Sequence, residues 1–332
     1  MPPGLLERRV PHLLQYITAE ERVAFVRDMG VSVIQDTIAG LYDAADHKLC
    51  QLGFWLAMVE MEKEMLGPLG SWMKTHYALL LSDEIDRRQV LALEYFGRRL
   101  VAFRTESGEV AVLDAHCPHL GADLGVGGVV VDESIRCPFH AWRFGRDGSC
   151  VEVPYAEKVP AKGKRVRSWP VRERNGLIFV WHDWSADEGA EPDWEVPVLP
   201  EHGDPEWSDW SRALLHIRTH SREVMENVAD RAHFGPVHNT EIEVFENVFE
   251  DHTATQVSQG VAYPRGGGRD AFSLKATYFG PAYQITWMDG VLESRLLLAH
   301  TPVRSTPRPA IDLRFGVMLR LVKGDQSLTD KF

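Results

Sequence analysis

Two short arms that contain cysteine and histidine constrain this chain more than any other feature. The first arm has the pattern Cys-x-His at Cys117 and His119, and 17 residues later the second has Cys-x2-His at Cys137 and His140. Thiolate and imidazole are the side chains that bind borderline and soft transition metals. One of each in each arm indicates a metal centre with mixed sulfur and nitrogen ligands, held between two tight loops.

This ligand set fits a dinuclear iron-sulfur cluster better than a single ion. A cluster can take both cysteines on one iron and both histidines on the other, as in a Rieske [2Fe-2S] centre. Neutral imidazoles lower the negative charge around the cluster and raise its reduction potential above that of a four-cysteine ferredoxin. A structural zinc site is the alternative, but its arms are usually Cys-x2-Cys or His-x3-5-His. A Cys-x-His arm fits zinc poorly.

The residues around the ligands also suit tight loops. Pro118 and Pro138 restrict the backbone next to each cysteine of the arms. Four glycines permit close turns in the first arm and after it: Gly121, Gly125, Gly127 and Gly128. The other two cysteines, Cys50 and Cys150, lie outside both arms, and we interpret them as free thiols. So few cysteines indicate a reducing, cytoplasmic location rather than a disulfide framework.

Composition and charge exclude other classes of protein. A chain of 332 residues, 44% hydrophobic and 25% charged, can bury a sizeable core and most often forms two domains. The net charge of -12 repels a phosphate backbone, so we expect no nucleic-acid partner. The longest uncharged run of the early apolar segment, residues 49–59, is about half a membrane span, and no secretory signal pattern precedes it. We expect a soluble protein without a membrane span.

Changes in residue pattern divide the chain into three parts. Residues 1–71 have helical spacing, and we assign this extension no role. Residues 72–183 contain short β-rich runs separated by turns with glycine, which predicts an all-β unit that carries both arms. An acidic, proline-rich connector opens the last part, residues 184–332, which we expect to form a second domain.

A second histidine motif lies in that last part. The stretch "ENVADRAHFGPVHNT" has Asp-x2-His-x4-His at Asp230, His233 and His238. A spacing of three places Asp230 and His233 on one face of a helix. We expect Gly235-Pro236 to end or bend that helix and to turn His238 back toward the same metal. Two histidines with a carboxylate form the facial triad of mononuclear Fe(II), which leaves positions for O2 and substrate. Alone, such a pair is more often a packing or surface feature; downstream of the first motif, the iron interpretation is favoured.

The arms "CPHLGADL" and "CPFHAWRF" resemble the cluster-binding loops of Rieske non-haem iron oxygenases. Rieske proteins of respiratory bc complexes carry an extra disulfide, for which this chain has Ala122 and Phe139. The stretches "ENVADRAHFGPVH" and "VFENVFEDHTATQ" are similar to those of the 3-ketosteroid 9α-hydroxylase oxygenase components and the cholesterol 7-desaturases. The resemblance implies an α+β fold, in which an all-β Rieske [2Fe-2S] domain precedes a helix-grip catalytic domain of antiparallel sheet and helices, after a helical N-terminal extension.

The resemblance also implies roles for the motif residues. His233 and His238 are the expected ligands of the catalytic iron, and Asp230 is expected to bridge to a cluster-ligating histidine of a neighbouring subunit in a ring-shaped homo-oligomer, commonly a trimer. The family's third iron ligand is an Asp or Glu on a late helix, and neither Asp325 nor Asp330 lies in such a pattern. The third ligand is therefore unassigned, and we expect the chain to be C-terminally incomplete. The expected cluster ligands are Cys117, His119, Cys137 and His140.

The activity that the resemblance implies is that of a multicomponent monooxygenase. Electrons from NAD(P)H would pass through a separate reductase, with or without a ferredoxin, to the cluster and then to the iron, where O2 is activated to hydroxylate or desaturate an apolar, steroid-like ring substrate. The chain has no nicotinamide or flavin motif of its own. The basic run at residues 162–167 is a candidate docking site for an acidic donor, although such runs are more often solvated turns. An electron carrier without a competent iron site, and an aryl or natural-product oxygenase or O-demethylase, stay open as alternatives.

Overall fold

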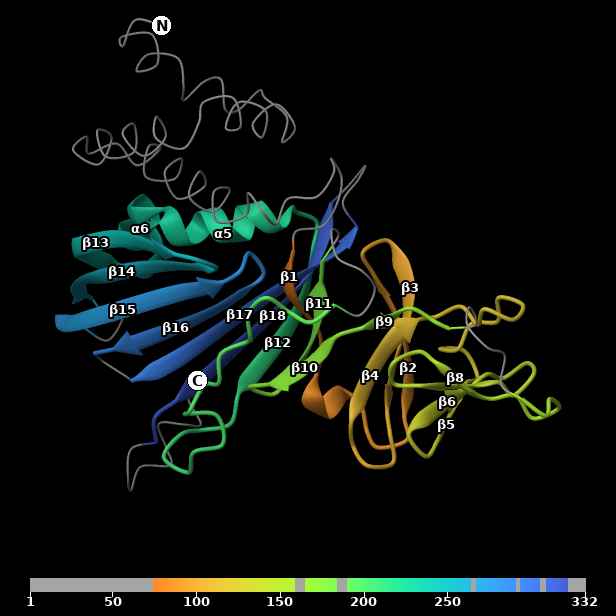
Figure 1. Ribbon diagram of the computed structural model, residues 1–332. Coiled ribbons are helices and arrows are strands. Elements are labelled where there is room, and N and C mark those ends of the chain that lie inside the picture. The colour runs from red at the N-terminus through yellow and green to blue at the C-terminus, as the bar shows by residue number, and fades with distance from the viewer. Residues whose placement is uncertain are drawn as a thin grey trace, which may run out of the picture.

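The computed structural model describes residues 74–158, 165–183, 190–263, 267–290, 293–304 and 309–321. The expected helical extension over residues 1–71 and part of the basic run, residues 162–164, lie outside the described residues. The described part is mostly antiparallel sheet, with two short α-helices on one face of the largest sheet (Figure 1). This confirms the expected α+β class. No described helix has both the length and the apolar character needed to cross a bilayer.

The first part of the described chain forms three small sheets. Their strand orders are β2-β3-β4-β9, β5-β6-β7-β8 and β1-β11-β10. A short 3-10 helix, η2, spans Ser82–Glu84 after the first strand. The bounds of the strands are β1 Thr75–Leu81, β2 Val90–Tyr95, β3 Arg98–Arg104, β4 Val110–Asp114, β5 Val129–Val131, β6 Ser134–Arg136, β7 Arg143–Gly145, β8 Cys150–Glu152, β9 Ser168–Trp169, β10 Val171–Arg174 and β11 Leu177–His182.

Strand β11 joins the first part of the fold to the second. It lies between β1 and β10 and is buried along its whole length, as its run of large apolar residues requires. Successive side chains of a strand point to opposite faces. Ile178 and Val180 therefore pack in the core beneath β1 and β3, whereas Leu177 and Phe179 pack with Tyr283 of the second sheet. One strand thus contributes to two hydrophobic cores.

The second part is a seven-stranded antiparallel sheet in the order β12-β18-β17-β16-β15-β14-β13. Helix α5, Ser221–Ala229, packs on it through Met225 and Val228, which contact a cluster around Tyr278. Helix α6, Phe234–His238, lies beside α5 on the same face (Figure 1). The strands are β12 Ser211–Ile217, β13 Thr240–Glu250, β14 Thr253–Ala262, β15 Asp270–Phe279, β16 Tyr283–Asp289, β17 Ser294–Arg304 and β18 Ala310–Leu319.

The helix that carries the second histidine motif breaks earlier than the sequence predicts. We expected Asp230 and His233 on one helix and a break at Gly235-Pro236, and both expectations are wrong. Helix α5 ends at Ala229, and Asp230 has an extended backbone with φ -84° and ψ 96°. The Asp230 side chain accepts a hydrogen bond from the Ala232 N–H at 2.9 Å and so caps a new 3-10 turn, Arg231–His233. Pro236 lies in the first turn of α6, where its missing N–H needs no helical partner.

Candidate metal centres

The two cysteine arms fold into matched turns. In the first arm, the Cys117 N–H donates to the Ala122 carbonyl at 2.9 Å, and the Gly121 N–H donates to the Cys117 carbonyl at 2.8 Å. The second arm repeats this pattern: the Cys137 N–H donates to the carbonyl five residues later at 2.8 Å, and the Ala141 N–H donates to the Cys137 carbonyl at 3.2 Å. The backbone of a cysteine thus closes both turns. Each turn places the side chain of that cysteine close to the histidine that follows it.

Each turn is closed by a residue in the left-handed region. Gly121 has φ +76° and Ala141 has φ +58°. Glycine adopts this conformation without steric cost, whereas alanine pays about 1–2 kcal/mol for it. The hydrogen bonds of the second turn hold Ala141 in this conformation. The glycine signal in the sequence therefore located only one of the two closing residues.

The four candidate ligands meet as two pairs. The thiols of Cys117 and Cys137 lie in the same buried cluster, at 2% and 3% exposure. The rings of His119 and His140 lie with their centroids 4.5 Å apart. Among the described residues, no three His, Cys, Asp or Glu side chains converge as ligands of one ion. Paired thiols beside paired imidazoles fit the two irons of a Rieske cluster, since each iron there takes two protein ligands.

Burial, opposed by the backbone N–H of His119 and reinforced by the neighbouring Cys137, raises the pKa of Cys117 to about 11. The thiol is therefore protonated at neutral pH in the protein alone. Thiolate is the form that binds a metal, so cluster binding displaces this proton and becomes more favourable as pH rises.

The first arm is held to the sheet by charged and close backbone contacts. The Arg99 guanidinium of β3 contacts Asp123 Oδ2 at 2.7 Å, and Asp123 Oδ1 accepts from the Gly125 N–H at 2.8 Å. A Cβ atom on Gly128 would lie 2.1 Å from the Leu124 carbonyl oxygen, which is far inside contact distance. Gly128 is thus required by a close approach of two backbone segments rather than by its own dihedral angles.

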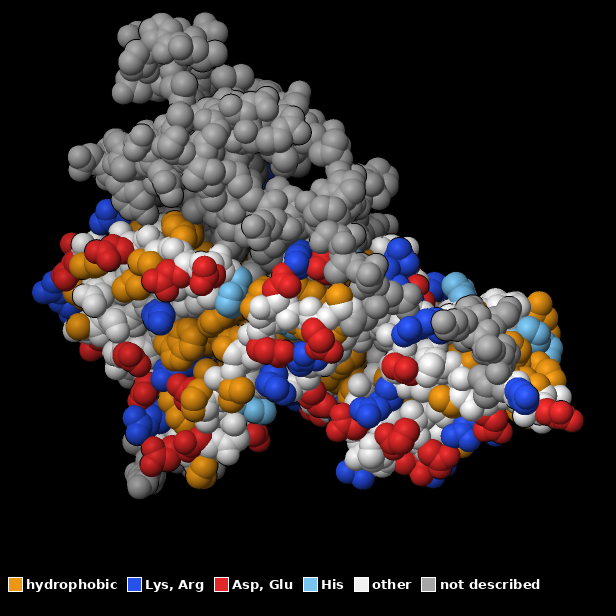
Figure 2. All heavy atoms as spheres, in the orientation of Figure 1, with side chains coloured by type: hydrophobic (Ala, Val, Ile, Leu, Met, Phe, Trp, Pro, Cys, Tyr) orange, Lys and Arg blue, Asp and Glu red, His pale blue; other side chains and the backbone are white. Residues whose placement is uncertain are grey.

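Apolar side chains surround the two histidines of the first centre. Leu120 and Phe139, each next to a candidate ligand, are 65% and 62% exposed. Figure 2 shows histidine and apolar side chains together at the far end of the first domain. Exposed apolar side chains that gather in one place favour contact with another protein surface.

The second motif brings its two histidines together. The His233 and His238 rings lie with their centroids 5.1 Å apart and nearly perpendicular, at 71°. Nδ1 of His233 is buried and has no hydrogen-bond partner within the described chain, and its nearest carboxylate oxygen is Asp230 Oδ2 at 3.8 Å. Two facing imidazoles with metal–nitrogen bonds of about 2 Å can share one ion. The arrangement fits a two-histidine iron site with a carboxylate beside it.

Burial, and then the neighbouring His233, holds the pKa of His238 below its ordinary value. The ring is therefore mostly neutral at neutral pH, and the neutral imidazole is the form that binds metal. The third ligand that the facial triad needs does not come from the described residues, where no third group joins this pair. Asp325 and Asp330 lie outside the described residues.

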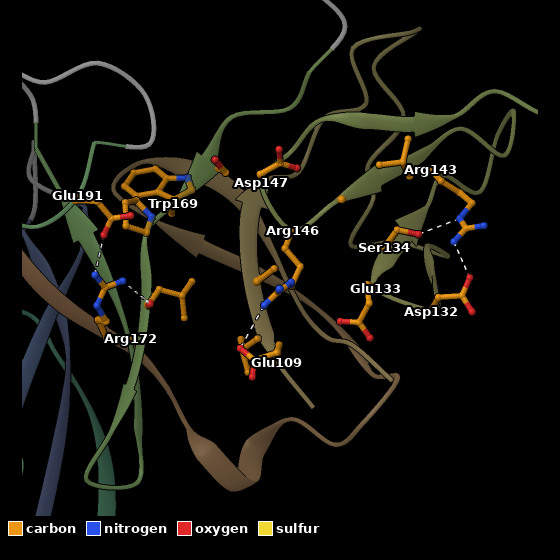
Figure 3. A pocket seen from close by; sticks show the side chains of 17 residues that line it. Glu109, Asp132, Glu133, Ser134, Arg143, Arg146, Asp147, Trp169, Arg172 and Glu191 are labelled. Atoms are coloured by element: carbon orange, nitrogen blue, oxygen red, sulfur yellow. Dashed lines mark hydrogen bonds and ion pairs between the residues drawn. The ribbon is translucent and has the colours of Figure 1, made fainter. Parts of the chain in front are cut away.

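A groove of about 710 Å3 in the first domain holds no such constellation (Figure 3). Three ion pairs join charged groups that line it, and the two remaining carboxylates, Glu133 and Asp147, accept hydrogen bonds from serines. Arg146 contacts Glu109 at 3.2 Å, and Arg172 contacts Glu191 at 2.7 Å. None of the candidate metal ligands lines the groove. We therefore assign it no chemical role.

The residues that sequence reasoning missed lie beside the first centre. The Trp142 indole stacks on the His119 ring at a centroid distance of 4.6 Å and an interplanar angle of 6°. Tyr155 accepts a hydrogen bond from the Trp142 indole nitrogen at 2.6 Å. The position of Trp142, two residues after His140, is the signal that could have identified it.

Family models match both parts of the chain. Residues 75–170 match the family model of the Rieske [2Fe-2S] domain, and residues 180–331 match that of the 3-ketosteroid 9alpha-hydroxylase C-terminal domain. The chain belongs to the Rieske non-haem iron oxygenases. It is 38% identical over 253 residues to the oxygenase component of the 3-ketosteroid-9-alpha-monooxygenase of Mycolicibacterium smegmatis, and this match covers 72% of the chain and 64% of that relative.

Two further curated relatives are similar to the chain. The oxygenase component of the Mycobacterium tuberculosis 3-ketosteroid-9-alpha-monooxygenase is 39% identical over 254 residues, covering 72% of the chain and 64% of the relative. A cholesterol 7-desaturase of Ciona intestinalis is 41% identical over 162 residues, covering 49% of the chain and 34% of the relative. The chain thus spans less than two thirds of the length of the curated relatives it matches.

Solved structures show the same fold. Dicamba monooxygenase bound to dicamba superposes with a TM-score of 0.63 at 20% identity, over 77% of this chain and 80% of that one. The Pseudomonas putida NdmA QL mutant with caffeine superposes with a TM-score of 0.61 at 18% identity, over 78% of this chain and 77% of that one. At this identity the likeness concerns the fold alone.

Proposed function

We propose that this chain is the oxygenase component of a multicomponent Rieske monooxygenase. One observation carries the proposal: a single chain contains both the paired arms of a Rieske centre and a separate facing histidine pair. A bare electron carrier of the ferredoxin kind needs only the first. When bound, the two groups would supply one-electron transfer and activation of O2.

In this proposal each residue of the two motifs has a defined task. Cys117 and Cys137 hold one iron of the cluster, and His119 and His140 hold the other. His233, in the turn before α6, and His238, at the end of α6, hold the mononuclear iron. The third ligand of that iron stays unassigned.

Electron transfer between the two centres is proposed to cross a subunit boundary. The cluster arms connect β4 to β5 and β6 to β7, whereas α6 packs on the edge strand β13 at the end of the second sheet away from the first domain (Figure 1). Such separation within one chain favours transfer between neighbouring chains of a homotrimer. Asp230, whose Oδ2 lies near His233 in this chain, is proposed to orient His233 and to accept a hydrogen bond from a cluster histidine of the adjacent subunit.

The proposed substrate is an apolar ring compound of the steroid class, and the reaction is hydroxylation or desaturation. Support comes from relatives that are named as 3-ketosteroid-9-alpha-monooxygenase components and as a cholesterol 7-desaturase. Oxygenation of an aryl or natural-product substrate, or O-demethylation, is the second candidate. The proposed electron source is NAD(P)H through a separate reductase, with or without a ferredoxin. The proposed location is the cytoplasm, which suits the free thiol of Cys150.

Metal analysis with substrate-dependent O2 uptake tests the proposal. The chain, reconstituted with iron and sulfide and supplied with reductase and NADH, is expected to contain a [2Fe-2S] cluster and one further iron, and to consume O2 when a 3-ketosteroid is added. His233→Ala and His238→Ala are expected to lose the further iron and keep the cluster. His202→Gln, at an exposed histidine of the same domain, is the matched control. Unchanged metal content in His233→Ala and His238→Ala would show an electron carrier. A colourless protein that contains zinc would exclude both the oxygenase and the electron carrier.

A further inference from the structure

One candidate ligand of the cluster is shielded by a particular side chain. The Trp142 indole lies almost parallel to the His119 ring, with 4.6 Å between centroids. The His119 and His140 rings lie at a steep angle of 68°, with 4.5 Å between centroids. One face of His119 is therefore covered by a large apolar ring that is itself only 6% exposed. Water reaches this side of the ligand only if the indole moves.

The indole makes one polar contact in addition to its packing in the buried core of the first domain. Its N–H donates to the Tyr155 hydroxyl at 2.6 Å. Tyr155 comes from the loop after β8 and is 64% exposed, so it has little apolar packing of its own to explain its position. A buried indole N–H normally needs an acceptor, and Tyr155 supplies it here.

Shielding of His119 has a direct electrostatic consequence. An oxidised cluster with two thiolates and two neutral imidazoles carries no net charge, and reduction adds one negative charge. A medium of low polarity disfavours the charged form, so exclusion of water from the cluster disfavours reduction. The stack therefore keeps the reduction potential of the cluster lower than it would be if water reached this face of the His119 ring.

We propose that Tyr155 is a positioning residue for the cluster: its hydroxyl holds the Trp142 indole flat against His119, and this stack lowers the reduction potential of the centre. The inference rests on the proposed function only in requiring that the arms bind a Rieske cluster. It does not depend on the substrate, on the mononuclear iron or on the oligomeric state.

The test is the midpoint potential of the reconstituted full chain, measured at one fixed pH by a redox titration followed by EPR. Tyr155→Phe removes the hydroxyl and keeps the ring. Trp142→Phe removes the indole, and Trp142→Tyr is used in its place if that chain does not retain the cluster. Tyr263→Phe is the matched control, since the Tyr263 hydroxyl also makes a hydrogen bond with a side chain, donating to Glu241 Oε2 at 3.0 Å, but lies in the second domain.

Tyr155→Phe is expected to raise the reduction potential. The expected increase in the equilibrium constant for one-electron reduction is about three- to tenfold, where tenfold corresponds to about 59 mV. Trp142→Phe is expected to raise it at least as much, and Tyr263→Phe to leave it unchanged. The double variant, which combines Tyr155→Phe with Trp142→Phe, is expected to have the same potential as Trp142→Phe alone, because Tyr155 acts through the indole.

Two results would overturn the inference: an unchanged potential in Tyr155→Phe, or shifts that add in the double variant. Either would leave the proposed function intact. A chain that forms no cluster without any substitution would instead contradict the proposed function itself.

Discussion

The Tyr95 hydroxyl donates a hydrogen bond to Asp312 Oδ2 at 2.7 Å and so joins β2 of the first domain to β18 of the second. The same hydroxyl accepts from Arg314 Nη2 at 3.1 Å. Asp312 Oδ1 contacts His216 Nδ1 at 2.6 Å, at the edge of a groove of about 680 Å3 between the two domains. Arg314 also donates to the backbone carbonyls of Ala78 and Leu79 in β1. This buried network fixes one domain against the other.

Replacing Tyr95 by phenylalanine tests how much this network contributes. The change leaves a buried carboxylate and a buried guanidinium each without one partner, and we expect the free energy of unfolding to fall by about 1–3 kcal/mol. Burial raises the pKa of Tyr95 to about 12, so the hydroxyl is a donor throughout the usual pH range. Urea unfolding measures the change. The exposed Tyr263→Phe is expected to shift stability by less than about 0.5 kcal/mol. Equal stability of the two variants would show that the network is not needed.

Acid is expected to destabilise the fold through buried histidines. Burial lowers the pKa of His76 to about 4, that of His182 to about 4 and that of His300 to about 3. In the unfolded chain these groups titrate near pH 6.5, so between pH 6.5 and 4 the unfolded state binds more protons. Their contribution to stability is therefore complete above pH 6.5 and is lost as pH falls toward 4. Urea midpoints at several pH values across this range are expected to decrease steadily.

His182→Phe isolates one part of this pH dependence. His182 packs among aromatic rings, with Phe96 at 5.3 Å and Trp169 at 5.8 Å between centroids, so phenylalanine keeps the packing and removes the titration. We expect the loss of stability between pH 7 and pH 4 to be smaller in this variant by up to about 3 kcal/mol. His202→Gln, at an exposed position, is expected to retain the full dependence. The same slope in both variants would contradict the assignment.

We expect cluster binding to depend on the close backbone approach at Gly128. Gly128→Ala would place a methyl group 2.1 Å from the Leu124 carbonyl oxygen, and we expect the chain to lose more than half of its cluster. Gly121→Ala is the matched control, because nothing lies within 4 Å of its added Cβ and only its φ of +76° is strained. That control is expected to cost about 1 kcal/mol and to keep most of the cluster. Iron, sulfide and visible absorption per chain give the result. Equal loss in both variants would count against the contact argument.

The three described cysteines are expected to behave differently. Cys117→Ala and Cys137→Ala each remove a candidate ligand, and we expect no Rieske EPR signal from either variant. Cys150→Ala is expected to retain the signal, since Cys150 lies on β8 and its thiol contacts the Glu152 carbonyl at 3.7 Å. Loss of the signal in Cys150→Ala alone would reverse the ligand assignment.

Electron donor docking on the basic run at residues 162–167 is open to a kinetic test. Lys164→Glu with Arg165→Glu is expected to slow reduction of the cluster by its donor about tenfold or more at low salt, and less at high salt, because steering between opposite charges is screened. Arg165 also donates to the Asp147 carbonyl at 2.7 Å. Arg165→Gln alone keeps a hydrogen-bond donor and serves as the control. Stopped-flow rates that do not differ from the parent chain would remove this site.

The sequence by itself determined what depends on neighbours along the chain. Cys117 and His119 stand two positions apart, and a tight turn on each cysteine brings the candidate ligands together, so motif spacing was enough to predict the first candidate centre. The pair His233 and His238 was likewise legible from spacing. The position of the helix break was not, because the competing cap at Asp230 depends on a backbone conformation that spacing does not encode.

Only the tertiary structure decided which distant groups meet. Tyr95 and Asp312 are 217 positions apart, and no local pattern relates them. The stack of Trp142 on His119 arises because the two arms converge on one centre, and its anchor Tyr155 comes from a separate loop. Such contacts follow from the packing of whole sheets, which sums many weak interactions along the chain, so they become visible only when the fold is complete.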